Sequence, residues 1–211
     1  MNANVTRLIR DTRPQPPEMR VFNAFAPDQD GLGAWARRTF IDDDGPLTND
    51  RHAHLQAADI GWLWTTAEAT NKNRRIAGEC RQIQTMQKRW SSAAAHWQLE
   101  QWFGQVPDFL ITIDAHFAAQ ADDWTFCAVI EHELCHAAQA EDEFGMPRFT
   151  KQGLPIFCTV AHEVEEFVDV VARYGAQATG VSDMVAAANR GPSIGQAAMD
   201  MACGTCARRV A

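Results

Sequence analysis

Residues 132–136 read His-Glu-Leu-Cys-His, a pattern whose residue types and spacing could perform metal-assisted hydrolysis. Two histidines four residues apart on a helix share a face and can bind one metal ion. The glutamate between them can accept a proton from a water molecule held by that metal. The pattern therefore predicts a zinc site in which His132 and His136 are ligands and Glu133 is the general base.

A catalytic zinc ion needs a third protein ligand, with a water molecule in the fourth position. The segment HEVEEFVD at 162–169 is predicted to be helical, with His162, Glu166 and Asp169 on its polar face. We expect His162 to be the third ligand, with Glu166 or Glu165 as alternatives. Glu165 and Asp169 also have the spacing of a thermolysin-like arrangement. A carboxylate that is not itself a ligand, in particular Asp169, could orient a zinc ligand through a hydrogen bond.

Other candidate residues are weaker. Asp142 lies ten residues after His132, where metzincins place a ligand, but Gln139 stands where their pattern has a glycine. Tyr174 is the only tyrosine, and it could donate a hydrogen bond to a substrate carbonyl, although a structural role is the simpler interpretation. The remaining histidines are expected to be surface or structural residues: His52, His54, His96 and His116.

Cys203 and Cys206 form a CxxC pair near the end of the sequence. Such a pair is half of a zinc site or a dithiol. A zinc ribbon would need a second pair, which this sequence lacks. We expect a free or reversibly oxidised pair, with an accessory metal site as the alternative.

The predicted elements give an α+β fold, a small zincin-like domain that is mostly helical. A short antiparallel sheet or hairpin is expected beside the helix that carries the motif. Helices are predicted over residues 51–70, 87–104, 124–140, 161–174 and 181–190, and strands over 76–83 and 108–114. The apolar side of helix 124–140 should face the core, as should Trp62, Trp64, Trp90 and Trp97. The edge of strand 108–114 could pair with an extended peptide.

The domain organisation follows from these elements. Residues 1–48 are predicted to be a partly irregular extension whose first twenty residues are loose. Residues 49–176 form the zincin-like core, and 177–211 form a helical tail with the CxxC pair.

Several segments resemble the phage metallopeptidase family, a group of zincins similar in outline to SprT-like peptidases. They are DFLITIDA (108–115), AVIEHELCHAAQ (128–139) and AHEVEEFVDVVARYG (161–175), together with HAHLQAADIGWLW (52–64) and RRIAGECRQI (74–83). The family's second motif reads His-Asp-x-Glu-Glu-Phe, and here Glu163 replaces the aspartate. The resemblance covers roughly residues 50–175. It implies a zinc peptidase of phage or prophage origin, supports His162 as a ligand and names no substrate.

Composition limits the partners. The 211 residues carry a net charge of −8, with 46% hydrophobic and 22% charged residues. This balance argues against a protein that coats nucleic acid or anionic membranes. No stretch is apolar enough to span a bilayer and the first twenty residues lack the apolar run of a secretory signal, so we expect the protein to lie in the bacterial cytoplasm.

A peptide or protein substrate is expected. The rival interpretations are a non-catalytic zinc-binding domain, which would not need Glu133, and a DNA-associated SprT-like protein.

Overall fold

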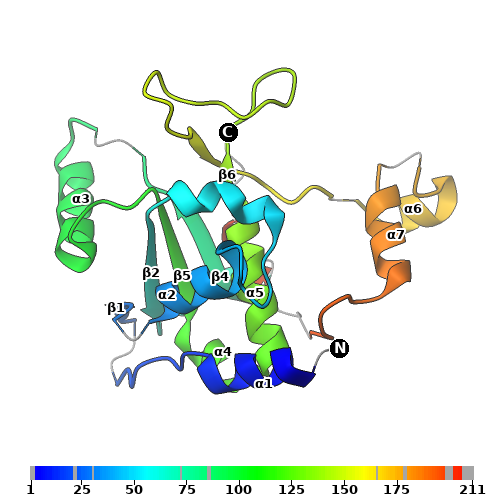
Figure 1. The fold of residues 1–211 in the computed structure, drawn as a ribbon, viewed down its shortest axis with the longest axis horizontal. Helices are drawn as coiled ribbons and strands as arrows, with labels where there is room; N and C mark the ends of the chain where they lie inside the picture. Colours follow the sequence, from blue (N-terminus) through cyan, green and yellow to red (C-terminus); the bar gives the residue numbers. More distant parts are fainter. Residues whose placement is uncertain are drawn as a thin grey trace.

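A mixed β-sheet forms the centre of the computed structural model (Figure 1). The structure describes residues 3–20, 23–29, 31–71, 73–84, 87–164, 166–177, 180–197 and 202–205. The strand order is β1-β2-β5-β4-β3, and β8 pairs with β4 beside this path. The strands are β1 (Phe25–Pro27), β2 (Ile60–Thr65), β3 (Thr70–Asn71), β4 (Arg74–Gln82), β5 (Phe109–Asp114) and β8 (Ala202–Cys203).

Strand β5 lies inside the sheet. It runs parallel to β2, with Ile111 opposite Trp62, and antiparallel to β4, with Ile111 opposite Cys80. Its alternation of β-branched and large apolar residues suits a strand with both faces covered. The strand itself was predicted, but the prediction that its edge could pair with a peptide is wrong, because β2 and β4 occupy both edges. The sheet is also mixed rather than antiparallel.

Helices cover both faces of the sheet. Helix α3 lies on one side of it and α5 on the other (Figure 1). The helices are α1 (Ala3–Thr12), α2 (Leu32–Ala36), α3 (Trp90–Phe103), α4 (Ala115–Gln120), α5 (Asp123–His136), α6 (Val168–Tyr174) and α7 (Ser182–Arg190), with the π-helix η1 (Arg37–Ile41) and the 3-10 helix η2 (Asp50–Ala57). A separate two-stranded sheet pairs β6 (Ala137–Gln139) with β7 (Phe157–Thr159). No helix in the described ranges is long and apolar enough to cross a membrane.

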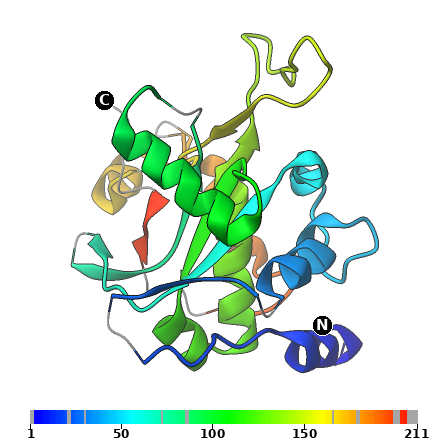
Figure 2. The same cartoon turned by 90° about the vertical axis from the view of Figure 1, so that its left-hand side faces the viewer.

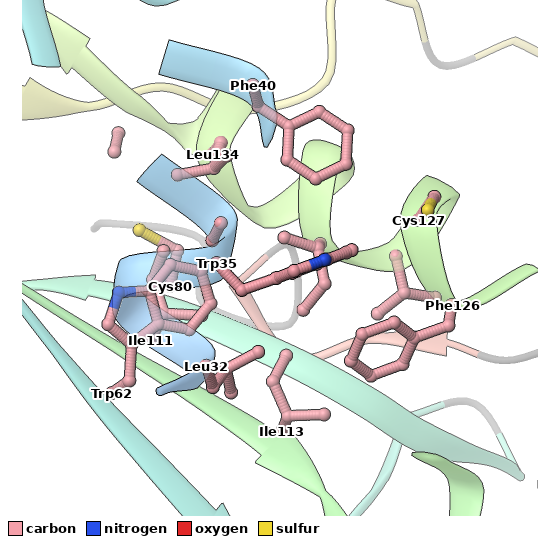
Figure 3. Close-up of a cluster of buried hydrophobic side chains, with 14 of the residues drawn as sticks. Leu32, Trp35, Phe40, Trp62, Cys80, Ile111, Ile113, Phe126, Cys127 and Leu134 are labelled. Atoms are coloured by element: carbon pink, nitrogen blue, oxygen red, sulfur yellow. The ribbon is translucent and has the colours of Figure 1, made fainter. Parts of the chain in front are cut away.

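The main hydrophobic core lies between the sheet and α5 (Figure 3). Phe126, Ile130 and Leu134 of α5 are fully buried, as predicted for the apolar side of this helix. Leu32, Trp35 and Phe40, from α2 and η1, complete the same cluster. The domain boundary predicted at 48/49 therefore passes through this core.

The prediction of a helix over 51–70 is wrong. The 3-10 helix η2 ends at Ala57, and Ile60–Thr65 forms strand β2. Five of the six β2 residues are buried, so the run has little periodicity of its own, and its apolar residues imitate helical spacing. Gly61 fits the strand because a Cβ there would lie 2.9 Å from the Phe103 ring.

The N-terminal extension is more ordered than predicted. Helix α1 places Ile9 in the core, with no exposed surface. Beyond it, the Arg13 guanidinium donates hydrogen bonds to the carbonyls of Ala118 and Ala121 and to the Asp123 carboxylate. The segment therefore packs against α4 and the start of α5 (Figure 2).

Two predicted helices carry exposed apolar residues. Helix α3 has the predicted extent, but Trp90 and Trp97 are 95% and 60% exposed rather than buried in the core. Residues 161–174 form a helix only from Val168 onward, and no residue of α6 is buried. Figure 1 shows α6 and α7 to one side of the sheet, where α7 agrees with the helix predicted over 181–190.

Candidate metal centre

Four side chains from three segments converge beside the end of α5. They are His132, His136, His162 and Cys203, whose potential ligand atoms all lie within 4.8 Å of one another. The Nε2 atom of His132 lies 3.3 Å from that of His136 and 3.0 Å from that of His162. The structure therefore brings the three predicted histidines together and adds a cysteine.

Helix α5 fixes the positions of His132 and His136. It is capped by Asp122, whose carboxylate accepts hydrogen bonds from the backbone N–H groups of Trp124 and Thr125. Its apolar side is buried against the sheet, which sets the rotation of the helix about its axis. The helix ends at His136, four residues before the predicted end, and the chain continues as β6. The Nε2 atom of His54 lies 2.8 Å from the carbonyl oxygen of Ala137 at this point.

The His136 ring is oriented by the backbone of Val160. Its Nδ1 atom lies 2.6 Å from the Val160 carbonyl oxygen, and Val160 N–H donates to the His136 carbonyl at 3.1 Å. A carbonyl can only accept, so Nδ1 carries the proton. In the neutral ring this leaves the Nε2 lone pair directed at the cluster, which is the tautomer that a metal ligand needs.

His162 does not lie on a helix, in contrast to the prediction. It follows β7 in irregular chain, six residues before α6 begins. The Val160 hydrogen bonds hold this chain against the end of α5. The next residue, Glu163, forms an exposed ion pair with Arg51 of η2. The helical periodicity of HEVEEFVD was therefore misleading, because His162 is carried by the segment that precedes the helix.

Glu133 is buried beside the cluster, with 1% of its surface exposed. A Cβ at Gly78 of β4 would lie 2.8 Å from its Cγ, so the glycine makes room for this side chain. The Thr205 hydroxyl is 3.1 Å from its Oε2 atom. Burial raises the pKa of Glu133 to about 8, with a further increase from Cys203 and an opposing effect of His136.

Cys203 reaches the cluster from β8, the short strand at the outer edge of β4. Its Sγ atom lies 3.3 Å from Nε2 of His136, and its side chain also hydrogen-bonds to Glu133. The CxxC spacing predicts a separate pair of this cysteine with Cys206. The structure instead places it in the main cluster, and Cys206 lies outside the described residues.

The donor set fits a tetrahedral metal. Two imidazole nitrogens bound to the same tetrahedral zinc ion are about 3.3 Å apart, given zinc–nitrogen bonds of about 2.0–2.1 Å. The separations of 3.0 and 3.3 Å between the histidine Nε2 atoms are close to this value. Imidazole and thiolate are ligands of borderline and soft metals, zinc among them, rather than of magnesium or calcium.

Among the described residues, the other predicted site residues lie outside the cluster. Glu166 accepts a hydrogen bond from the N–H of Phe167, Asp169 lies in the first turn of α6, and Tyr174 is exposed at its end. Asp142 accepts hydrogen bonds within its own loop. Glu165 lies outside the described residues. Among the remaining histidines, His52 is buried, and this burial lowers its pKa to about 4.

Three features of the site were missed by sequence analysis: the hydroxyl of Thr205, the close approach at Gly78 and the carbonyl of Val160. A glycine inside a strand can mark a site where another group approaches closely, so Gly78 was detectable in principle. Backbone carbonyls and a lone threonine leave no comparable signal in a sequence.

Comparison with known proteins gives one match. A family model described as "Putative phage metallopeptidase" matches residues 33–189, which include every histidine of the cluster and Glu133. No curated protein and no solved structure matches the chain.

Proposed function

Because the chain belongs to the phage metallopeptidase family, we propose that it is a zinc-dependent peptidase whose metal is held by His132, His136 and His162. The observation that carries this proposal is the convergence of three imidazole Nε2 atoms beside a buried glutamate. Zinc, when bound, would polarise a peptide carbonyl and make water a stronger nucleophile. The family supports the reaction class, and the geometry supports this choice of residues.

Glu133 is proposed as the general base. It follows His132 directly, and its carboxylate is enclosed by Gly78 and Thr205. A buried carboxyl beside the cluster is placed both to accept a proton from a metal-held water and to return it to the leaving amine. The neighbouring hydroxyl of Thr205 restricts the orientation of the carboxylate.

The proposed substrate is a peptide or protein segment in extended form. Strand β4 runs past Glu133, and its outer edge faces away from β5. The backbone groups of Gly78 and Cys80 at this edge form hydrogen bonds with residues 204–205. An extended peptide could form equivalent bonds by strand addition, which would bring a backbone carbonyl to the cluster with little demand on side-chain identity.

Replacing the base tests the proposal. Glu133→Gln keeps the size and the metal ligands, so we expect hydrolysis of labelled casein to fall about 10²–10⁴-fold while zinc binding stays near stoichiometric. Glu131→Gln is the matched control, because Glu131 lies on the same helix, bonds to Asn49 and lies outside the cluster. Normal hydrolysis by the Glu133→Gln protein would contradict the proposed mechanism.

One observation favours a second candidate, a non-catalytic zinc domain. Structural zinc sites are closed by four protein ligands, and Cys203 is a fourth donor at this centre. A buried glutamate has no purpose in such a site, and burying it is unfavourable. Zinc binding without any hydrolysis in the wild type and in every Cys203 variant would favour this second candidate.

A further inference from the structure

We propose that β8 is an inhibitory segment of this chain: Cys203 occupies the position beside the three histidines that substrate and water require, and the strand covers the edge of β4. The inference rests on the proposed peptidase function and concerns the regulation of that same site. Three contacts of residues 203–205 support it.

The first contact is that of the sulfur atom. Cys203 Sγ lies 3.3 Å from Nε2 of His136, and its side chain hydrogen-bonds to Glu133. The sulfur therefore lies between a proposed ligand and the proposed base. A reacting water molecule must lie in the same place, because the base has to reach it and the metal has to hold it.

The second contact is the strand pairing. Strand β8 runs parallel to β4, with Cys203 opposite Gly78, and the N–H of Gly204 donates to the Gly78 carbonyl at 2.9 Å. Gly204 is buried, and a Cβ on it would lie 2.8 Å from Cβ of Glu79. The segment thus lies flush against the edge that an extended substrate would need.

The third contact is Thr205, which bonds to the next edge position of β4. Its hydroxyl accepts from the N–H of Cys80 at 2.7 Å, and lies 3.0 Å from the Cys80 carbonyl and 3.1 Å from Glu133 Oε2. The hydroxyl has one proton, so it can donate to only one of these two oxygens at a time. Residues 203–205 therefore contact the base, a ligand and the substrate edge together.

These contacts make substrate binding and β8 docking mutually exclusive. The described part of β8 is only two residues long, so few bonds hold it to β4. A protein that is active only when this strand has left the edge has a rate proportional to the fraction of molecules in that state. Removing the thiol or displacing the strand should therefore raise activity.

The first test is spectroscopic and does not depend on catalysis. The full-length protein is loaded with cobalt(II), and the near-ultraviolet thiolate-to-cobalt charge-transfer band is recorded. We expect the band in the wild type and in Cys158→Ser, the control for a partly buried thiol outside the cluster. It should be absent from Cys203→Ser. Absence of the band from the wild type would overturn the proposal.

The second test measures hydrolysis of labelled casein by the zinc-loaded proteins. We expect Cys203→Ser to be about tenfold or more faster than the wild type, and Cys158→Ser to be unchanged. Gly204→Val, which keeps the thiol but cannot lie flat on Glu79, should weaken the cobalt band and raise activity. Circular dichroism checks that each variant is folded. A folded Cys203→Ser protein no faster than the wild type would refute inhibition.

A double variant separates this inference from the function on which it rests. Adding Glu133→Gln to Cys203→Ser should abolish the gained hydrolysis. If the gain persists in the double variant, the assignment of the base is wrong while inhibition by β8 stands. If no variant hydrolyses casein although the cobalt band behaves as expected, the peptidase function fails and Cys203 is a structural ligand.

Discussion

Helix α5 and the two segments that meet its end contribute to the same cluster in different ways. His132 and His136 lie on a helix whose other side is buried in the main core. His162 and Cys203 come from irregular chain at 160–162 and from the two-residue strand β8. The comparison teaches that one half of the site is fixed by a helix buried in the core, and that the other half is held beside it by backbone hydrogen bonds, of Val160 with His136 and of Gly204 with Gly78.

The two halves should differ most in how much the metal-free protein is destabilised when one histidine of each half is removed. His136→Ala and His162→Ala each delete one donor, so both should weaken zinc binding by about 10²-fold or more. Only His136 is buried and paired with Val160. In the metal-free protein, His136→Ala should lower the free energy of unfolding by about 1–3 kcal/mol, and His162→Ala should change it by less than about 0.5 kcal/mol.

Denaturant unfolding in a chelator and competition with a zinc indicator measure these two quantities separately. Equal losses of metal-free stability in the two variants would contradict this expectation, because they would show that His162 contributes as much to the folded core as His136. Stoichiometric, tight zinc binding by His162→Ala would show that the third ligand is elsewhere.

The division between the half of the site on α5 and the half on short segments also explains which features could be predicted from the sequence. The buried side of α5 was correctly predicted, because burial on one side imposes a helical period, and strand β5 was correctly predicted from its β-branched residues. His162 does lie in the cluster, although it was predicted as a ligand from the periodicity of a helix that begins only at Val168. Cys203 could not be placed, because a strand pairing between residues 78 and 203 leaves no local pattern.

Strand β2 shows the opposite limit of sequence analysis. Its residues are buried, yet burial on both faces removes the alternation that identifies a strand, and a helix was predicted instead. The exposed Trp90 and Trp97 show a related limit, since helical spacing of large apolar residues does not prove that a core covers them.

Gly78 and Gly61 allow a second comparison, between a glycine that contacts Glu133 and a glycine that contacts Phe103. Gly78→Ala places a methyl group 2.8 Å from Cγ of Glu133, so it should displace the proposed base and lower hydrolysis about 10–100-fold. Gly61→Ala creates a similar clash, 2.9 Å from the Phe103 ring, among residues that pack with α3. It should lower stability and leave the activity of each folded molecule nearly unchanged.

The two glycine variants are compared by thermal unfolding and by the rate of casein hydrolysis per folded molecule. The pair distinguishes a positional effect on the base from general damage to the sheet. Equal losses of activity in both variants would mean that Gly78 acts only through the stability of β4.

The smallest effect is expected at the Arg51–Glu163 ion pair, which joins η2 to the residue after His162. Both side chains are about two-thirds exposed or more, at 68% and 71%, so water and salt screen their attraction. A double-mutant cycle with Arg51→Ala and Glu163→Ala should give a coupling energy of about 0.2–1 kcal/mol that decreases at high salt.

Zinc affinity should change by less than about threefold in either variant, because RT ln 3 is about 0.65 kcal/mol. The Val160 backbone bonds to His136 are internal to the fold and would still position His162 in both variants. Removing either charge could instead lower zinc affinity more than about tenfold. That result would show that the ion pair, and not the backbone of Val160, holds His162 against α5.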